Sequence, residues 1–338
     1  MSLRKATIEA MAGHEVPAPV LEAAFAEIME GGASEAAIAG LLVALRTKGE
    51  TVGEIVAAAR ALRAHADVAE GDPDAVDTCG TGGDGADTFN ISTAAAFVVA
   101  GAGVPVAKHG NRSATSRCGS IDVLEGLGVV VDLSTAQSAQ LLSEVGIAPF
   151  FARRAHPAMR HVAPVRAALG VRTLMNCLGP LLNPVGVRHQ LVGVYDAGLV
   201  SPLADALGQL GARRALVVHG DDGLDELTTT AETRAALFAD GRLETLRLAP
   251  EQAGLARSRP EDLRGGDCDE NVAIVRAILG GETGPRCDVV LANAGAALWV
   301  AGAAAGWAAG VERARESLAS GAAAARLEAL VSASGRLA

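Results

Sequence analysis

Short β-like segments alternate with helical segments from residue 75 onward, and this alternation constrains the fold more than any other feature of the sequence. The predicted strands cover 75–79, 104–108, 129–132, 147–152, 189–195, 213–220 and 288–293. The predicted helices between them cover 92–101, 120–127, 135–145, 201–210 and 269–280, and further helices follow to the C-terminus. Such alternation is typical of a mostly parallel sheet with helices on both faces. The irregular segment 228–266 leaves room for a hairpin.

The first 70 residues contain helical patterns only. Leu21, Phe25 and Ile28 recur at helical spacing, and Thr51 with Glu54 has the form of a capping box that opens a further helix through residue 66. We therefore predict a small helical domain over residues 1–70, followed by an α/β domain over residues 71–338.

The composition excludes several classes of protein. Half of the 338 residues are hydrophobic, only 3% are aromatic, and the net charge is −10. This balance excludes a disordered chain and an aromatic stacking surface for single-stranded nucleic acid, and it disfavours nonspecific attraction to a polyanion. Any anionic ligand must therefore be held by a local cationic pocket.

Cysteine usage and hydropathy bear on the compartment. The five cysteines, at positions 79, 118, 177, 268 and 287, include no C-x-x-C pair, which predicts reduced thiols rather than a disulfide framework or a zinc site. The N-terminus develops no apolar core of a signal peptide, and two uncharged stretches, 88–107 and 289–311, are interrupted by polar residues and glycines. We expect a cytoplasmic protein without membrane spans.

A glycine-rich segment follows the predicted strand 75–79. It runs Asp77-Thr-Cys-Gly80-Thr-Gly-Gly83-Asp-Gly85 and leads through Asn90-Ile-Ser-Thr into an apolar helix. Glycines let a backbone approach a ligand closely, and a helix N-terminus directs free N–H groups at an anion. The segment is therefore interpreted as a phosphate cradle, although it matches neither a Walker loop nor the dinucleotide spacing. Taken alone, it is equally compatible with a tight strand-to-helix turn capped by Ser or Asn.

A second loop, residues 108–120, follows the next predicted strand. Its 13 residues hold one Lys, two Arg, one His, one Asn and four hydroxyl groups, in a protein that is acidic overall. Cationic side chains and hydroxyls suit phosphate oxygens, and ligands bind at the carboxyl ends of strands in open α/β sheets. The alternative, an ordinary solvated basic loop, explains Arg117 but not the density of the other groups.

Together the two loops, GTGGD-x3-T-x-NIST and KHGNR-x2-TS-x2-GS-x-D, closely resemble the anthranilate phosphoribosyltransferase family of tryptophan biosynthesis. Further matching segments are HPAM at 156–159, PVRAALGVRT at 164–173, NCLGPLLNP at 176–184 and residues 220–226. The resemblance extends from the TVGEI helix to about residue 302. Three positions depart from the usual family pattern, in that Thr115 and Cys118 stand where Ser is more usual and Ile121 where Ala is.

The resemblance implies a helical domain packed on a larger α/β domain of the nucleoside phosphorylase and phosphoribosyltransferase type. It places phosphoribosyl diphosphate (PRPP) and magnesium, with two ions per active site, in the cleft between the domains. It also implies that a segment near 165–180 returns to the helical domain and that homodimers form through that domain. Neither nucleic acid nor a membrane is an expected partner.

Site residues carry over position by position. For PRPP the resemblance implies Gly80, Gly83, Asp84, Thr88, Asn90, Ser92, Thr93, Lys108, His109, Gly110, Asn111, Arg112, Ser113, Ala114, Thr115, Ser116 and Ser120. For anthranilate it implies Gly80, Asn111 and Arg166, and for magnesium Ser92, Asp225 and Glu226. A planar guanidinium suits the anthranilate carboxylate, and carboxylates beside a diphosphate suit a hard cation. The alternative, that these acids are only solvated residues of a turn, fits Asp221 and Asp222 better than it fits the Asp225–Glu226 pair.

The implied reaction is displacement of pyrophosphate from the ribose anomeric carbon by the anthranilate amine. An aromatic amine is already neutral near pH 7, so no residue is assigned as general base, and His109 and His156 are left out of the catalytic set. Two rival functions remain. A pyrimidine nucleoside phosphorylase would share the fold, and a non-catalytic relative would bind nucleic acid.

Overall fold

The computed structural model describes residues 2–112 and 117–337. Four helices form the N-terminal part: α1 (Ser2–Met11), α2 (Ala18–Met29), α3 (Glu35–Lys48) and α4 (Val52–Ala64). The predicted capping box is confirmed, since Thr51 Oγ1 accepts from the Glu54 N–H and the Glu54 carboxylate accepts from the Thr51 N–H. Glu54 is fully buried and is also bonded to Lys48 Nζ at 2.8 Å and to the Val16 N–H at 2.8 Å, so it joins three segments of the bundle.

A seven-stranded sheet forms the centre of the larger part, in the order β3-β2-β1-β4-β5-β6-β7. The parallel strands are β1 (Val76–Gly80), β2 (Val106–Gly110), β3 (Ile147–Phe151), β4 (His189–Gly193) and β5 (Arg214–Gly220). The hairpin left open in segment 228–266 is β6 (Thr233–Ala239) with β7 (Arg242–Leu248), which extends the sheet in antiparallel pairing. The chain turns from one side of the sheet to the other between β1 and β4, and this switch point is where open α/β sheets bind ligands.

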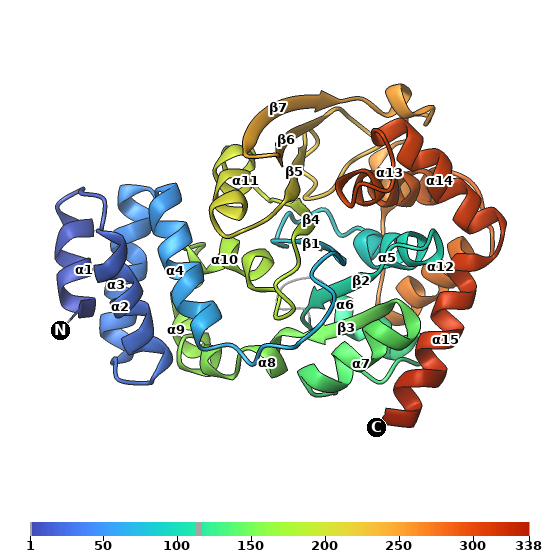
Figure 1. Ribbon diagram of the computed structural model, residues 1–338. Helices are drawn as coiled ribbons and strands as arrows, with labels where there is room; N and C mark the ends of the chain where they lie inside the picture. The colour runs from blue at the N-terminus through green and yellow to red at the C-terminus, as the bar shows by residue number, and fades with distance from the viewer. Residues whose placement is uncertain (1, 113–116, 338) are drawn as a thin grey trace.

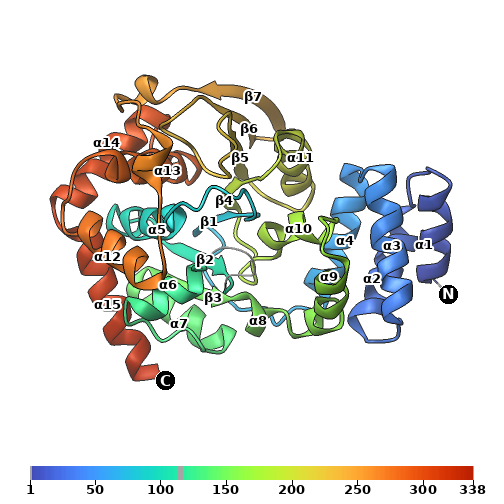
Figure 2. The same ribbon diagram turned by 180° about the vertical axis from the view of Figure 1, so that it is seen from behind.

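Helices cover both faces of the sheet (Figure 1, Figure 2). Outside the connection between β3 and β4, these helices are α5 (Ile91–Gly101), α6 (Ser120–Gly126), α7 (Thr135–Val145), α11 (Val200–Gln209), α12 (Cys268–Leu279), α13 (Pro285–Val300), α14 (Trp307–Ala319) and α15 (Ala322–Leu337). Three short helices, α8 (Ala152–Ala155), α9 (Ala163–Leu169) and α10 (Met175–Leu178), lie on the path between β3 and β4. The predicted fold, a helical N-terminal part with an α/β part and a mostly parallel sheet, is confirmed.

Two buried clusters follow from the alternation of side chains along the strands. Leu191, Leu216 and Val218 face the cluster that α5 and α13 complete, whereas Val192 and Val217 face α11 and the N-terminal helices. The core of the helical bundle is thus continuous with one face of the sheet. Segment 163–178 joins this second cluster, and α9 packs against α3. Within the described parts of the chain, every helix is too short or too polar to span a bilayer.

Two of the predicted strands are wrong. Residues 129–132 are extended but pair with no strand, and they lead from α6 to α7 with Val129 and Val131 buried in the core. Residues 288–293 lie inside α13, which begins at Pro285 and is buried around most of its circumference. A helix that is apolar on all sides loses the 3.6-residue period, so its sequence resembles a buried strand.

The prediction of reduced thiols throughout is also wrong, because Cys118 and Cys268 form a disulfide. Cys118 lies just before α6 and Cys268 begins α12, and these helices pack together with the two Cα atoms 5.1 Å apart. The two cysteines are 150 residues apart in the sequence, so no local spacing indicates that they pair. Cys79, Cys177 and Cys287 are free thiols.

Candidate active site

The glycine-rich segment forms an open loop between β1 and α5. Gly82, Gly83 and Gly85 have φ values of +67°, +79° and +75°, in the left-handed region where a side chain is strained. Asn90 occupies the N-cap of α5, but its side chain makes no capping bond and donates instead to the Cys118 carbonyl at 3.1 Å. Asn90 therefore does not cap the helix, whereas the backbone N–H of Ser92, in the first turn of α5, is bonded to the Glu226 carboxylate.

Hydrogen bonds from several parts of the fold hold this loop in place. The Gly82 N–H donates to Asp225 Oδ2 at 2.7 Å, and the Tyr195 N–H donates to Thr81 Oγ1 at 3.0 Å. Arg172 Nη2 also donates a hydrogen bond to the Gly83 carbonyl. The glycine-rich loop is thus anchored to the ends of β4 and β5 and to the segment that follows α9.

Behind the loop, a buried polar network connects β1 to β2. Lys108 Nζ donates to the Thr78 carbonyl at 2.6 Å and lies 3.4 Å from Ser92 Oγ, while Asp77 accepts from the His109 N–H and from Asn183 Nδ2. Burial lowers the pKa of Lys108 and raises the pKa of Asp77 to about 6. Burial costs a charged form its hydration, and the neighbouring opposite charge only partly offsets that cost.

The second loop is less open to a ligand than its composition suggests. Arg112 pairs with Asp122 at 2.8 Å and with both oxygens of Glu125, so two carboxylates already balance its charge. Ser120 Oγ donates to the Asn111 carbonyl at 3.3 Å. Four of the residues implied for PRPP, Ser113, Ala114, Thr115 and Ser116, lie outside the described residues.

Three carboxylates gather beside the glycine-rich loop. Asp225 and Glu226 follow β5, and the Asp225 N–H donates to Asp84 Oδ2 at 3.4 Å. Burial, together with repulsion from Asp84 and Glu226, raises the pKa of Asp225 well above its ordinary value. Burial raises the pKa of Glu226 to about 7, although Lys108 and Ser92 oppose this shift. Such mutual repulsion is what a bound cation relieves, so the donor set fits a hard divalent ion.

Three or more His, Cys, Asp or Glu side chains arranged to hold a metal by themselves are not found among the described residues. Magnesium commonly takes one or two carboxylates with substrate phosphates and water, and the Asp225–Glu226 pair provides two carboxylates. Asp221 and Asp222, which the sequence assigned to the solvated turn, are exposed; Asp221 pairs with Arg234 and Arg247.

The residues implied for anthranilate come from three elements: Gly80 ends β1, Asn111 follows β2 and Arg166 lies in the last turn of α9. The Arg166 side chain has no hydrogen bond or ion pair to any described residue, and partial burial lowers its pKa. An uncommitted guanidinium of this kind is suited to a carboxylate ligand. The rings of His109 and His156 pack edge to face, with their centres 5.2 Å apart. Burial lowers the pKa of both side chains.

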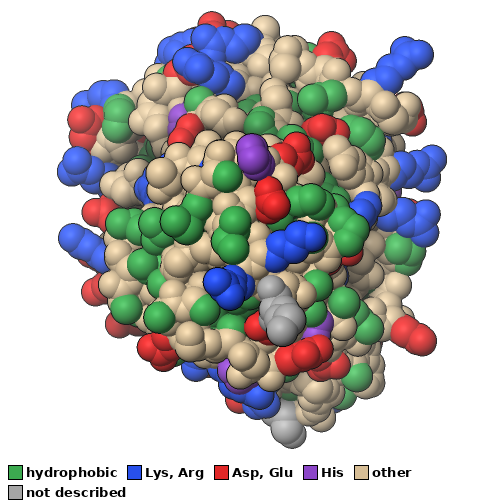
Figure 3. Space-filling view, turned by 90° about the vertical axis from the view of Figure 1, so that its left-hand side faces the viewer, with side chains coloured by type: hydrophobic (Ala, Val, Ile, Leu, Met, Phe, Trp, Pro, Cys, Tyr) green, Lys and Arg blue, Asp and Glu red, His purple; other side chains and the backbone are tan. Residues whose placement is uncertain are grey.

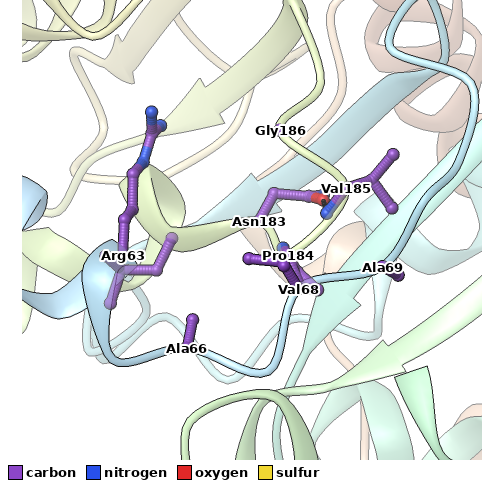
Figure 4. Close-up of a pocket in the computed structure, with 9 residues that line it drawn as sticks. Arg63, Ala66, Val68, Ala69, Asn183, Pro184, Val185 and Gly186 are labelled. Carbon is purple, nitrogen blue, oxygen red and sulfur yellow. Dashed lines mark hydrogen bonds between the residues drawn. The ribbon is translucent and has the colours of Figure 1, made fainter. Parts of the chain in front are cut away.

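A separate cavity of about 200 Å³ lies where the chain passes from α4 to the sheet. Arg63, Val68, Pro184 and Val185 are among the residues that line it (Figure 4). Arg63 Nε donates to the Leu181 carbonyl at 2.7 Å. None of the residues implied for either substrate lines this cavity, so it is distinct from the candidate active site.

Comparisons with known proteins agree with this architecture. Two profiles of the glycosyl transferase family match the chain, the helical bundle domain over residues 5–66 and the a/b domain over residues 72–324. An anthranilate phosphoribosyltransferase from Rubrobacter xylanophilus is 54% identical over 337 residues, which cover 99% of this chain and 98% of the relative. The chain belongs to the anthranilate phosphoribosyltransferase family. The crystal structure of the enzyme from Thermus thermophilus matches with a TM-score of 0.93 and 44% identity, over 98% of this chain and 99% of that chain.

Another member of the anthranilate phosphoribosyltransferase family, from Saccharomyces cerevisiae, was solved in complex with PRPP and Mg. It is 28% identical, covers 99% of this chain and 98% of its own, and has a TM-score of 0.91. The yeast enzyme was also solved in complex with 4-fluoroanthranilate, with a TM-score of 0.89 at 27% identity over 99% of this chain and 98% of that chain.

Two asparagines that support the candidate active site, Asn293 and Asn271, were not predicted from the sequence. Asn293 is fully buried and exchanges two hydrogen bonds with Leu227, at 2.8 and 3.0 Å, which holds the residue after Glu226. Asn271 donates to Asn90 Oδ1 at 3.1 Å. These partners lie 66 and 181 residues apart, so no motif spacing could have joined them.

Proposed function

We propose that this protein transfers the 5-phosphoribosyl group from PRPP to the amine of anthranilate, giving N-(5-phosphoribosyl)anthranilate and pyrophosphate in tryptophan biosynthesis. The observation that carries the proposal is the meeting of the glycine-rich loop with the carboxylate pair, at the switch point of the sheet. Relatives about half identical over nearly the whole chain are anthranilate phosphoribosyltransferases, which supports the same activity here.

For PRPP, the proposal assigns diphosphate binding to the glycine-rich loop and the start of α5. Lys108 supplies a buried positive charge below the loop, and a Cβ at Gly80 would lie 2.7 Å from Asp225 Oδ2 and would displace that carboxylate. Arg112 has weaker support than Lys108, because Asp122 and Glu125 already neutralise it.

For magnesium, Asp225, Glu226 and Ser92 are the proposed ligands, and two ions per site remain part of the proposal. When bound, the metal would stabilise the negative charge of the departing pyrophosphate. The chain's own task is to orient the two substrates so that the amine faces the anomeric carbon opposite the leaving group. The nitrogen–carbon bond forms as the carbon–oxygen bond to pyrophosphate breaks, and the amine proton is then lost to water.

For anthranilate, the proposal assigns Arg166 to the carboxylate, with Asn111 and Gly80 beside it. Arg166 lies on α9, whereas the glycine-rich loop assigned to PRPP follows β1, so the two substrates are held by different parts of the fold. A neutral aromatic amine needs no strong base, and none of the described residues is given that role.

We also propose a homodimer that forms through the helical end of the molecule. Ile8 and Met11 on α1 and Val43 on α3 are 55%, 75% and 41% exposed, and these two helices are neighbours. Hydrophobic side chains appear on this face in Figure 3. Light scattering should give the mass of two chains, and Met11→Asp should shift it towards one. A monomeric wild type would contradict the dimer.

The domain boundary near residue 70 and a cytoplasmic location remain predictions of the sequence.

The decisive experiment follows the loss of anthranilate fluorescence in the presence of PRPP and Mg²⁺. The double variant Asp225→Asn, Glu226→Gln should need far more Mg²⁺ and lose turnover at saturating PRPP, because leaving-group stabilisation acts in the transition state. Asp221→Asn is the matched control from the same loop and should behave like the wild type. Phosphorolysis of thymidine or uridine without consumption of anthranilate would favour the phosphorylase instead, and salt-dependent retardation of nucleic acid would favour the binding protein.

A further inference from the structure

Arg172 makes two contacts that neither substrate assignment uses. Its guanidinium carbon lies 3.9 Å from the centre of the Tyr195 ring, and its Nη2 donates to the Gly83 carbonyl. The side chain is exposed and forms no ion pair with a described carboxylate. A solvated arginine loses rotamer freedom when it is held in one place, so two specific contacts on an exposed side chain call for a reason.

The Gly83 contact determines how the glycine-rich loop presents its N–H groups. A trans peptide is planar, with its carbonyl and N–H pointing in opposite directions, and the described residues contain no cis peptide. When Arg172 holds the Gly83 carbonyl, the Asp84 N–H of the same peptide is directed to the other side of the loop. Gly83 has φ +79°, and a glycine has no side chain to restrict its backbone. The orientation of this peptide therefore depends on a contact from outside the loop.

The anchor also joins two parts of the fold. The contacts nearest Gly83, to Asp225, Tyr195 and Gly193, come from the ends of β5 and β4, and the far end of the loop bonds to Leu263 and Gly265. Arg172 instead follows α9, which packs against α3 of the N-terminal bundle and carries Arg166. The Tyr195 ring fixes the guanidinium plane, which a flexible Lys ammonium would not allow.

We propose that Arg172 is a positioning residue for PRPP, which sets the Gly83–Asp84 peptide and ties the PRPP loop to the segment that carries Arg166. This inference rests on the proposed function. It predicts that loss of the Arg172 contacts weakens PRPP binding while the fold is retained, since the side chain lies on the surface.

The test uses the full-length protein and compares Arg172→Met, Arg172→Lys, Tyr195→Leu and Tyr195→Phe. Calorimetry with PRPP and Mg²⁺ should show a rise in the PRPP dissociation constant of about tenfold for Arg172→Met, the size expected for one hydrogen bond. Arg172→Lys should recover part of the loss, Tyr195→Leu should shift the constant in the same direction by less, and Tyr195→Phe should match the wild type. Arg160→Met removes an exposed arginine from the same stretch of chain and should change nothing.

A second measurement reports on the loop without any substrate. Hydrogen exchange of the peptide that contains residues 81–85 should be faster in Arg172→Met than in the wild type, at an unchanged melting temperature. Wild-type PRPP affinity in Arg172→Met would overturn the proposal, and so would an affinity loss that merely follows a loss of thermal stability. A wild type that neither binds PRPP nor consumes anthranilate would overturn the proposed function, and unchanged loop exchange in the variant would overturn the anchoring separately.

Discussion

The end of β4 offers a sharp test of how the fold positions the carboxylate pair. Gly193 pairs with Gly80 of β1, and a Cβ built on it would lie 1.5 Å from the Asp225 carbonyl oxygen. Ordinary contacts begin at 3.4 Å, so Gly193→Ala would have to displace the backbone at residue 225 by about 1.9 Å. That backbone cannot swing away freely, because Asn293 holds Leu227 by two hydrogen bonds.

Two consequences follow for Gly193→Ala. Overpacking of a buried position costs about 1–3 kcal/mol of the free energy of unfolding. Displacement of a reacting group by roughly 1 Å costs on the order of 100-fold in rate, so kcat should fall by at least that factor and the Mg²⁺ requirement should rise. Denaturant unfolding measures the first effect, and the anthranilate fluorescence assay across a Mg²⁺ titration measures the second.

Gly208→Ala is the matched control, because a Cβ there would lie 2.2 Å from the Phe238 ring, between α11 and β6. It should destabilise the fold but leave kcat and the Mg²⁺ dependence of the folded protein unchanged. A folded Gly193→Ala protein with wild-type turnover and Mg²⁺ dependence would refute the reasoning. Equal losses of turnover in both variants would refute it too.

Three further predictions concern other parts of the molecule. Arg166→Ala should raise the anthranilate KM by about 10- to 150-fold, since a hydrogen bond to a charged group contributes about 1.5–3 kcal/mol, and it should leave the PRPP KM nearly unchanged in steady-state kinetics. Because burial raises the pKa of Asp77 from 3.8 to about 6, the folded state holds this proton more tightly than the unfolded chain does. The free energy of unfolding should therefore fall as the pH rises between these values, by at most about 3 kcal/mol, and Asp77→Asn should flatten the slope in urea titrations. Reduction of the Cys118–Cys268 disulfide should lower the free energy of unfolding by about 2–4 kcal/mol, because the bond restricts the unfolded chain between two residues 150 positions apart. A Cys268→Ser protein as stable as the oxidised wild type would contradict this.

Local signals in the sequence were sufficient for most of the fold. The capping box at Thr51 was predicted because a helix cap depends on neighbours within a few residues. The order of the strands was not predicted: the long connection over residues 152–188 returns the chain from β3 at one edge of the sheet to the far side of β1. The strand predicted at 288–293 failed because burial of α13 on nearly every side erases the pattern that separates the two structures.

The sequence by itself placed the glycine-rich loop and the Asp225–Glu226 pair at the ends of strands, because each motif is contiguous. Only the tertiary structure decided what holds them. The Arg172 contact with Gly83, the Asn293 contact with Leu227 and the Cys118–Cys268 disulfide join residues 89, 66 and 150 positions apart. Such pairs form when sheet and helix packing brings distant backbones together, and a linear pattern contains no information about which distant side chains will meet.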